Sequence, residues 1–189
     1  MANISNRNLL LLMLGVGKSP DCVGQGINGI TRLQKLLFLL TAEGHVQETK
    51  DGYQFQAYIA GPYSPVIYDD LEFLENLGFI QSEISGAATT EEAADIDITF
   101  EDLMEDEEAN TPDVYDEKRF TLTPEGQEKV KLLLASKEFA PVAEGIRKIK
   151  SKYGNYSLDD LLYYVYTKYP EMTTESEIKD HVLRKGRKT

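Results

Sequence analysis

Apolar residues recur with helical spacing in several separate segments of the chain. Residues 31–42 place leucines on one stripe and keep Arg32 and Lys35 outside it, which predicts a helix with a buried face. Residues 6–14 are apolar on nearly every side, so a helix there is expected to be buried all around. Both helices are therefore expected to belong to a hydrophobic core.

The segment 58–80 carries the clearest local signals. Ser64 is a favoured N-cap residue, Pro65 suits the first helical position, and Gly78 suits a left-handed stop. The apolar residues between them recur at helical spacing, and they are Ile67, Leu71, Leu74 and Leu77. These signals predict a helix over residues 65–77.

Two short strands are expected on either side of a long polar stretch. Residues 79–84 and 118–122 are predicted to form a hairpin, and Thr123-Pro124 then opens another helix with Thr123 as its cap. Helix, strand, hairpin, strand and helix is the order found in the second half of a winged helix. The predicted fold class is mostly α with a small β-hairpin, a winged helix-turn-helix core with appended C-terminal helices.

The remaining segments complete this outline. Alternating aromatic and polar residues predict a half-buried strand over 53–58, and Gly61-Pro62 predicts a turn after it. A glycine-rich stretch over 15–29 is expected to be a connector. Further helices are predicted over about 124–137 and 140–152, between Ser157 and Pro170, and from the capping box Thr174-Glu-Ser-Glu177 to about Arg184.

Six of the eleven tyrosines lie in the C-terminal region, at Tyr153, Tyr156, Tyr163, Tyr164, Tyr166 and Tyr169. Aromatic side chains dominate burial in cores and interfaces alike. We therefore expect these tyrosines to pack the C-terminal helices on the rest of the fold.

The net charge of −12 comes from one stretch of the chain. Residues 91–117 hold 13 acidic residues and no Lys or Arg, so the rest carries 19 acids against 20 bases. We expect an acidic wing insertion over 85–117, ordered in part, inside a winged-helix domain that spans residues 1–137. A helical extension over 138–189 is expected to pack on that domain.

The residue inventory offers little for catalysis or for cofactor binding. Cys22 is the single cysteine, and with only His45 and His181 no Cys/His metal framework can be assembled. No combination of nucleophile, base and orienting residue stands out. The apolar run 9–14 is too short for a membrane span or a signal peptide. We therefore expect a cytoplasmic protein that is not an enzyme and that uses no cofactor, metal or membrane.

Four blocks of sequence resemble a known group of prokaryotic proteins. The blocks are Ile30-Thr-Arg-Leu-Gln-Lys-Leu-Leu-Phe-Leu-Leu40, Tyr58-x-x-Gly-Pro-Tyr-Ser-Pro-x-x-Tyr68, Leu77-Gly-Phe-Ile80 and Leu122-Thr-Pro-Glu-Gly126. Together they resemble the YwgA-like proteins, and the first two are similar to the antitoxin SocA-like family called Panacea. The resemblance implies a prokaryotic or phage-derived winged-helix protein with no known enzymatic chemistry. For Panacea-type relatives it implies binding of a toxin or delivery of the toxin to a protease.

DNA binding is the function that a winged helix suggests first, but the charges of the predicted helix oppose it. Residues 65–77 contain no Lys or Arg, and their charged residues are Asp69, Asp70, Glu72 and Glu75. At about 4 Å each carboxylate would repel a phosphate by about 1 kcal/mol even in water. A winged-helix transcriptional regulator is therefore the alternative, and the residues that would contact DNA in it are Lys148, Lys150, Arg184 and Lys185.

We favour a protein-binding regulatory module, antitoxin- or adaptor-like, that recognises a basic partner such as a toxin or a nucleic-acid enzyme. Opposite charge would steer the two proteins together. The expected partner-binding residues are Tyr63, Asp69, Asp70, Glu72 and Glu75. The sequence leaves open whether the protein also forms a homodimer.

Overall fold

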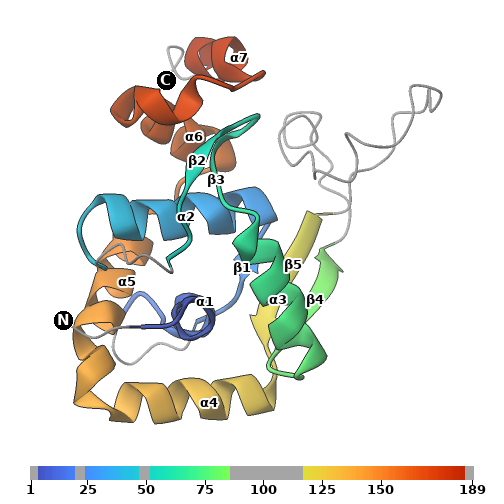
Figure 1. Cartoon of the computed structure of the whole chain (residues 1–189), viewed down its shortest axis with the longest axis vertical. Coiled ribbons are helices and arrows are strands. Elements are labelled where there is room, and N and C mark those ends of the chain that lie inside the picture. Colours follow the sequence, from blue (N-terminus) through green and yellow to red (C-terminus); the bar gives the residue numbers. More distant parts are fainter. Residues whose placement is uncertain (1–3, 20–23, 47–51, 86–116, 186–189) are drawn as a thin grey trace.

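Helix α1 (Asn6–Gly15) lies in the middle of the computed structural model (Figure 1). Helices α2 (Ile30–Ala42), α4 (Pro124–Ala135) and α5 (Ala140–Tyr153) surround it, and a sheet closes the remaining side. Every residue of α1 from Leu9 onward is buried. This central position explains why the helix is apolar on all sides, as the sequence predicted.

The structure describes residues 4–19, 24–46, 52–85 and 117–185. Over these residues the protein is mostly helical and carries a small antiparallel sheet. The expected insertion 85–117 lies outside the described residues except for its two ends, which belong to strands.

Those strands form the larger sheet. Strands β4 (Ile80–Ser85) and β5 (Glu117–Leu122) pair antiparallel with Ile80 opposite Leu122, which confirms the predicted hairpin. A third strand, β1 (Ile27–Asn28), pairs with β5, and the order across the sheet is β1-β5-β4. The sequence did not predict β1, because a strand of two residues inside a glycine-rich connector leaves no alternating pattern.

Helix α3 (Val66–Asn76) follows the predicted boundaries closely, but its predicted cap is wrong. Gly78 takes the expected left-handed conformation, with φ of 73°. Ser64 does not cap the helix, because its hydroxyl donates to the carbonyl oxygen of Tyr53 and its backbone N–H donates to Gln34 Oε1 at 2.8 Å. Ser64 is fully buried, so it joins α3 to α2 instead.

The predicted strand over 53–58 is shorter than expected, and the predicted turn at Gly61-Pro62 is wrong. The structure has a two-stranded hairpin of β2 (Gln56–Tyr58) and β3 (Gly61–Tyr63), so Gly61 and Pro62 belong to a strand. Gly61 has a φ of 86°, and a Cβ there would lie 2.9 Å from the Tyr166 ring. Glycine is needed for both reasons.

Two of the sequence blocks quoted above contact each other directly. Gln34 and Lys35 lie on α2, are 2% exposed each, and point toward the strand and turn that precede α3. Lys35 Nζ donates to the carbonyl oxygen of Pro62 at 3.0 Å, beside the bond from Ser64 N–H to Gln34. These two polar side chains satisfy backbone groups that burial would otherwise leave unpaired.

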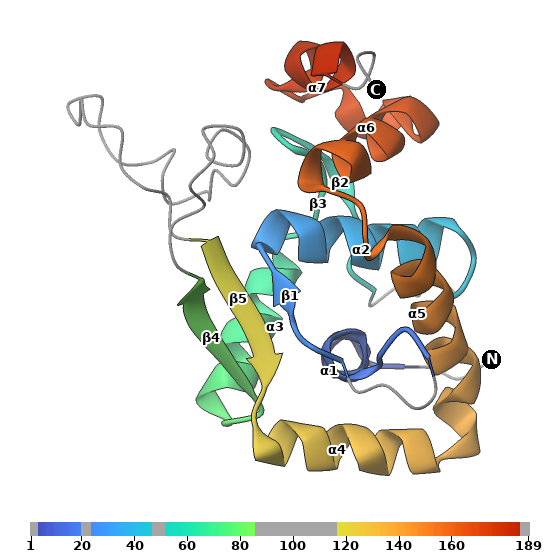
Figure 2. The same ribbon diagram turned by 180° about the vertical axis from the view of Figure 1, so that it is seen from behind.

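The C-terminal helices extend the molecule at one end, where α6 (Leu158–Lys168) lies next to the β2–β3 hairpin and α7 (Lys179–Lys185) packs on α6 (Figure 2). Short 3₁₀ turns at Lys137–Phe139 and Pro170–Thr173 connect the helices. Among the tyrosines of this region Tyr153 and Tyr166 are buried in the core. Packing of the C-terminal helices through tyrosines is thus confirmed for these residues.

The predicted start of the last helix in the capping box 174–177 is wrong, since α7 begins at Lys179. The capping-box residues make other contacts. Ser176 shares a hydrogen bond of 2.8 Å with the Tyr166 hydroxyl, and Glu177 N–H donates to the carbonyl oxygen of Ile59. The segment therefore joins α6 to the β2–β3 hairpin.

In the part of the chain that the structure describes, none of the helices combines the length and the apolar character that crossing a bilayer requires.

Candidate functional site

Helix α3 buries one face and exposes the other. Its buried residues are Ile67, Asp70, Leu71 and Leu74, which share one side at 100° per residue. Figure 1 shows α3 on the outside of the molecule, with α1 and strand β4 as its neighbours. We call the exposed residues Val66, Asp69, Glu72, Phe73, Asn76 and Leu77 the outer face of α3.

Two of the predicted partner-binding carboxylates, Asp69 and Glu72, lie on this outer face and are exposed. They are one helical turn apart, so both project from the same side. Glu75 is also exposed, but one of its oxygens accepts from Ser82, from the backbone N–H at 3.0 Å and the hydroxyl at 2.7 Å. Glu75 thus connects α3 to β4 in addition to carrying charge.

Asp70 was predicted to be a partner-binding residue, but the structure buries it against α1. It is 5% exposed, and its Oδ1 accepts from Arg7 Nε at 2.9 Å. The Arg7 guanidinium also lies 3.5 Å from the centre of the Phe73 ring. Asp70 therefore fastens α3 to α1, and it does not belong to the exposed acidic surface.

Tyr63 lies at the end of β3 in a group of three tyrosine rings. Its ring centre is 4.7 Å from that of Tyr58 and 6.0 Å from that of Tyr68 on α3. Partial burial raises the pKa of Tyr63, and the neighbouring Tyr58 and Asp69 raise it further. The tyrosine group therefore borders Asp69 on α3.

Exposed apolar side chains accompany the acidic ones on the same helix. Val66 is 37%, Phe73 is 40% and Leu77 is 53% exposed. Single exposed apolar residues are common on protein surfaces, but three on one short helix form a strip. The outer face of α3 is thus both acidic and apolar.

The four predicted DNA-contacting residues do not form one surface. Lys150 is buried, and its Nζ donates to the carbonyl oxygen of Val16. Burial lowers the pKa of Lys150 to about 8, and the charge of Lys18 contributes to the decrease. A buried ammonium group of this kind cannot reach a phosphate, so Lys150 is removed from the predicted set.

The other three basic residues are divided between two helices. Lys148 is exposed on α5, while Arg184 and Lys185 lie on α7, which is at the end of the molecule and away from α5 (Figures 1 and 2). Lys185 Nζ pairs with Asp159 at 3.3 Å, and Arg184 Nε donates to the Asp180 carbonyl oxygen. Lys148 and Arg184 remain as exposed cations of the predicted set.

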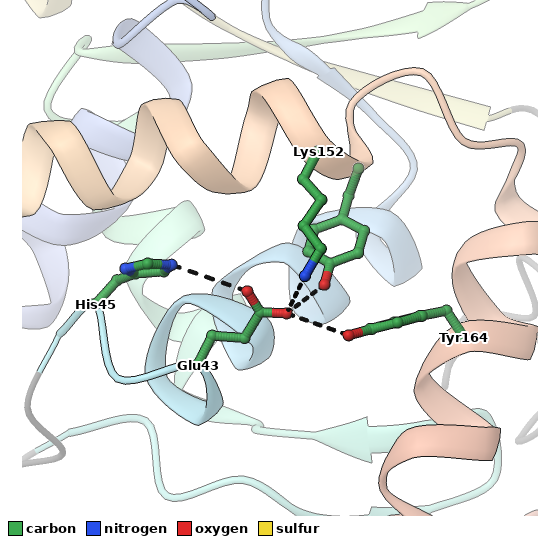
Figure 3. Close-up of polar contacts among 5 residues, drawn as sticks. Glu43, His45, Lys152 and Tyr164 are labelled. Atoms are coloured by element: carbon green, nitrogen blue, oxygen red, sulfur yellow. Dashed lines mark hydrogen bonds and ion pairs between the residues drawn. The ribbon is translucent and has the colours of Figure 1, made fainter.

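A second polar cluster joins α2, α5 and α6. It consists of Glu43, His45, Lys152, Tyr153 and Tyr164, which we call the Glu43 cluster (Figure 3). Glu43 Oε1 accepts from the Tyr153 hydroxyl, from Lys152 Nζ at 3.1 Å and from the Tyr164 hydroxyl at 3.3 Å. His45 Nε2 lies 3.8 Å from the other carboxylate oxygen.

The electrostatics of the Glu43 cluster favour an ionised carboxylate. Burial acts to raise the Glu43 pKa, but the hydrogen bonds from Tyr153, Lys152 and Tyr164 together outweigh burial and lower it. Burial and the Glu43 carboxylate raise the pKa of Tyr153. Every donor stabilises the charge of one acceptor, which is the pattern of a structural clamp between three helices.

Among the described residues no group of three or more His, Cys, Asp or Glu side chains is arranged to hold a metal ion. The Glu43 cluster contains a single carboxylate and one histidine beside it, which is too few for a metal site.

Comparison with known proteins adds no family. A scan against protein-family models finds no match, and a search against curated proteins finds none either.

Proposed function

We propose that this protein is a non-enzymatic regulatory module, antitoxin- or adaptor-like, that binds a basic protein partner through the outer face of α3. The observation that carries the proposal is the exposure of Asp69 and Glu72 on a helix whose residues 66–76 include no Lys, Arg or His. A cationic partner would gain attraction from this face and a faster association. DNA would meet repulsion.

A winged-helix core is part of this proposal. Two observations support it: the chain order α1, β1, α2, α3, β4, β5 and the sheet order β1-β5-β4. In a winged helix α3 would hold the position that enters the major groove and β4–β5 would form the wing. We propose that this helix is acidic, where a DNA-reading helix would be basic, because it binds a protein partner.

The resemblance to YwgA-like and Panacea proteins points in the same direction. The contact between Gln34-Lys35 on α2 and Pro62-Tyr-Ser64 before α3 gives a physical reason for the two resembling blocks to occur together. That contact orients α3 and its outer face. A toxin or a nucleic-acid enzyme is the kind of basic partner that we propose.

The test is affinity capture from the native host with three forms of the full chain. They are the unmodified protein, the double variant Asp69→Lys/Glu72→Lys, and a control Glu171→Lys/Glu175→Lys. The control makes the same change in net charge on exposed residues of the C-terminal region. Bound proteins are identified by mass spectrometry at low and high salt.

We expect the unmodified protein and the control to retain a basic protein that the α3 variant loses and that high salt releases. Filter binding to double-stranded DNA, run in parallel, tests the transcriptional-regulator alternative. Sequence-specific DNA binding by the unmodified protein at physiological salt, reduced by Lys148→Ala/Arg184→Ala and unharmed by the α3 variant, would overturn the proposal.

A further inference from the structure

Three exposed apolar residues of α3 and the buried Asp70 together have the spacing of a coiled-coil seam. Val66, Asp70, Phe73 and Leu77 follow one another at intervals of four, three and four residues. This is the alternation of d and a positions in a heptad, and it places the four side chains in one line along the helix. A helix that packs along another helix uses such a line.

The polar member of this line is already paired within the chain. Arg7 binds Asp70 through Nε and places its guanidinium over Phe73, so the charge of Asp70 is compensated. Val66, Phe73 and Leu77 remain 37%, 40% and 53% exposed. The seam therefore offers three apolar side chains for packing, and the carboxylate among them pairs with Arg7 through Oδ1.

The acidic residues lie directly beside the seam. At 100° per residue, Asp69 lies 40° and Glu72 lies 100° around the helix from Phe73, on the side facing solvent. In coiled coils the charges that flank the seam select the partner helix. A partner that fits this face has apolar residues along one line and Lys or Arg next to it.

We propose that the occupant of the outer face of α3 is a basic amphipathic α-helix of the partner protein. This inference rests on the proposed function and specifies the shape of the partner segment. The apolar side chains of that helix pack on Val66, Phe73 and Leu77. Its cations pair with Asp69 and Glu72.

A second copy of this chain fits the face less well. A symmetric pair of α3 helices would place the carboxylates of Asp69 and Glu72 from both copies along one interface. Like charges in such positions repel, and α3 itself supplies no Lys or Arg to compensate them. Charge complementarity thus favours a basic helix from another protein.

The probe is a synthetic peptide of about 18 residues made of leucine and lysine, with leucine at the heptad a and d positions. A scrambled peptide of the same composition spreads leucine over all sides and measures the non-specific attraction of the acidic chain. Binding to the full-length protein is measured by fluorescence anisotropy at about 150 mM salt. Amide chemical shifts locate the contact.

Two matched variants separate the seam from other exposed apolar residues. Val66→Gln/Leu77→Gln removes two seam residues, and Ile84→Gln/Leu132→Gln removes two residues that lie off α3 and are 62% and 70% exposed. We expect the seam variant to bind the amphipathic peptide about tenfold or more less tightly than the unmodified protein does. The off-seam variant should change this affinity by less than about twofold. Circular dichroism checks that each variant is folded.

The outcomes distinguish this inference from the proposed function. If Asp69→Lys/Glu72→Lys abolishes capture of the basic partner but the seam variant binds the amphipathic peptide normally, the seam is overturned and the proposed function stands. If amphipathic and scrambled peptides bind equally, or if the shifts fall outside α3, the inference is also overturned. A concentration-dependent dimer that the seam variant abolishes would show that a second copy occupies the face.

Discussion

Helices α2 and α3 have similar lengths and both are amphipathic, but they are used in different ways. Ten of the thirteen residues of α2 are buried, against four of the eleven residues of α3. Helix α2 contacts α5, α6, β1 and β3, whereas α3 lies against α1 and β4. The same kind of hydrophobic pattern thus produces an internal scaffold in one case and a surface element in the other, because neighbours decide how much of a helix is covered.

The polar residues of the two helices differ in the same way. On α2, Gln34 and Lys35 are buried and bond to backbone groups before α3. On α3, Asp69 and Glu72 are exposed, while Asp70 pairs with Arg7 and Glu75 accepts from Ser82. Substitutions on α2 should therefore affect stability, and substitutions on the outer face of α3 should affect binding.

The largest expected effect is that of removing a core leucine from α2. Leu37→Ala should reduce the free energy of unfolding by about 2 to 5 kcal/mol, because the side chain is fully buried and its loss leaves a cavity. Leu77→Ala, at the end of α3, should cost less than about 1 kcal/mol, since Leu77 is 53% exposed. Urea titration of both variants measures the difference, and equal costs would contradict the comparison.

The next effect concerns the buried amide of α2. Gln34→Met keeps the length of the side chain but leaves the Ser64 N–H without its acceptor, which should cost about 1 to 3 kcal/mol. Gln81→Met is the control, because Gln81 is exposed on β4 and should change stability by less than about 0.5 kcal/mol. Thermal and chemical denaturation of the pair check this. A loss of stability no greater than that of the control would mean that the Gln34 side chain does not stabilise the segment before α3.

The comparison also shows which parts of the fold a sequence can reveal. Helix α2 was predictable from the helical spacing of its leucines, α1 from a run that is apolar on nearly every side, and α4 because Thr123 and Pro124 mark its start. Strand β1 and the start of α7 were missed because hydrogen bonds to distant residues determine them. Local sequence patterns predict that a helix or strand forms. The residues that it contacts depend on the whole fold.

Two residues that were predicted to lie on a binding surface are buried in the structure, and their positions along the helix indicated this burial. Asp70 shares a side with Ile67 and Leu74, and Lys150 follows the stripe of Ile146 and Ile149, so both were candidates for burial. Charge alone assigned them to the surface. The Glu43 cluster had no such signal, because α2, α5 and α6 contribute to it from separate parts of the chain.

A smaller effect is expected at the C-terminal end of α2, where Glu43 binds α5 and α6. Glu43→Gln removes the charge that Tyr153, Lys152 and Tyr164 stabilise, and should cost about 1 to 2 kcal/mol at neutral pH. The Glu43 pKa is lowered by folding, so its contribution is present above the unfolded pKa and is lost as pH falls through the folded pKa.

The difference in stability between the unmodified protein and Glu43→Gln should therefore decrease as the pH falls below about 4.3. Urea titrations at a series of pH values measure it. A difference that grows as the pH falls below about 4.3 would have the wrong sign for this clamp.

The smallest effect on stability is expected on the outer face of α3, where Asp69→Lys/Glu72→Lys should change the free energy of unfolding by less than about 0.5 kcal/mol. Both carboxylates are exposed. Asp70→Asn on the same helix should cost more, about 1 kcal/mol, because it removes the charge that Arg7 pairs with. Measured together, the two variants test whether the acidic residues of α3 divide by face. If the double variant destabilises the protein as much as Asp70→Asn does, Asp69 and Glu72 support the fold. Their exposed charge would then not indicate a binding surface.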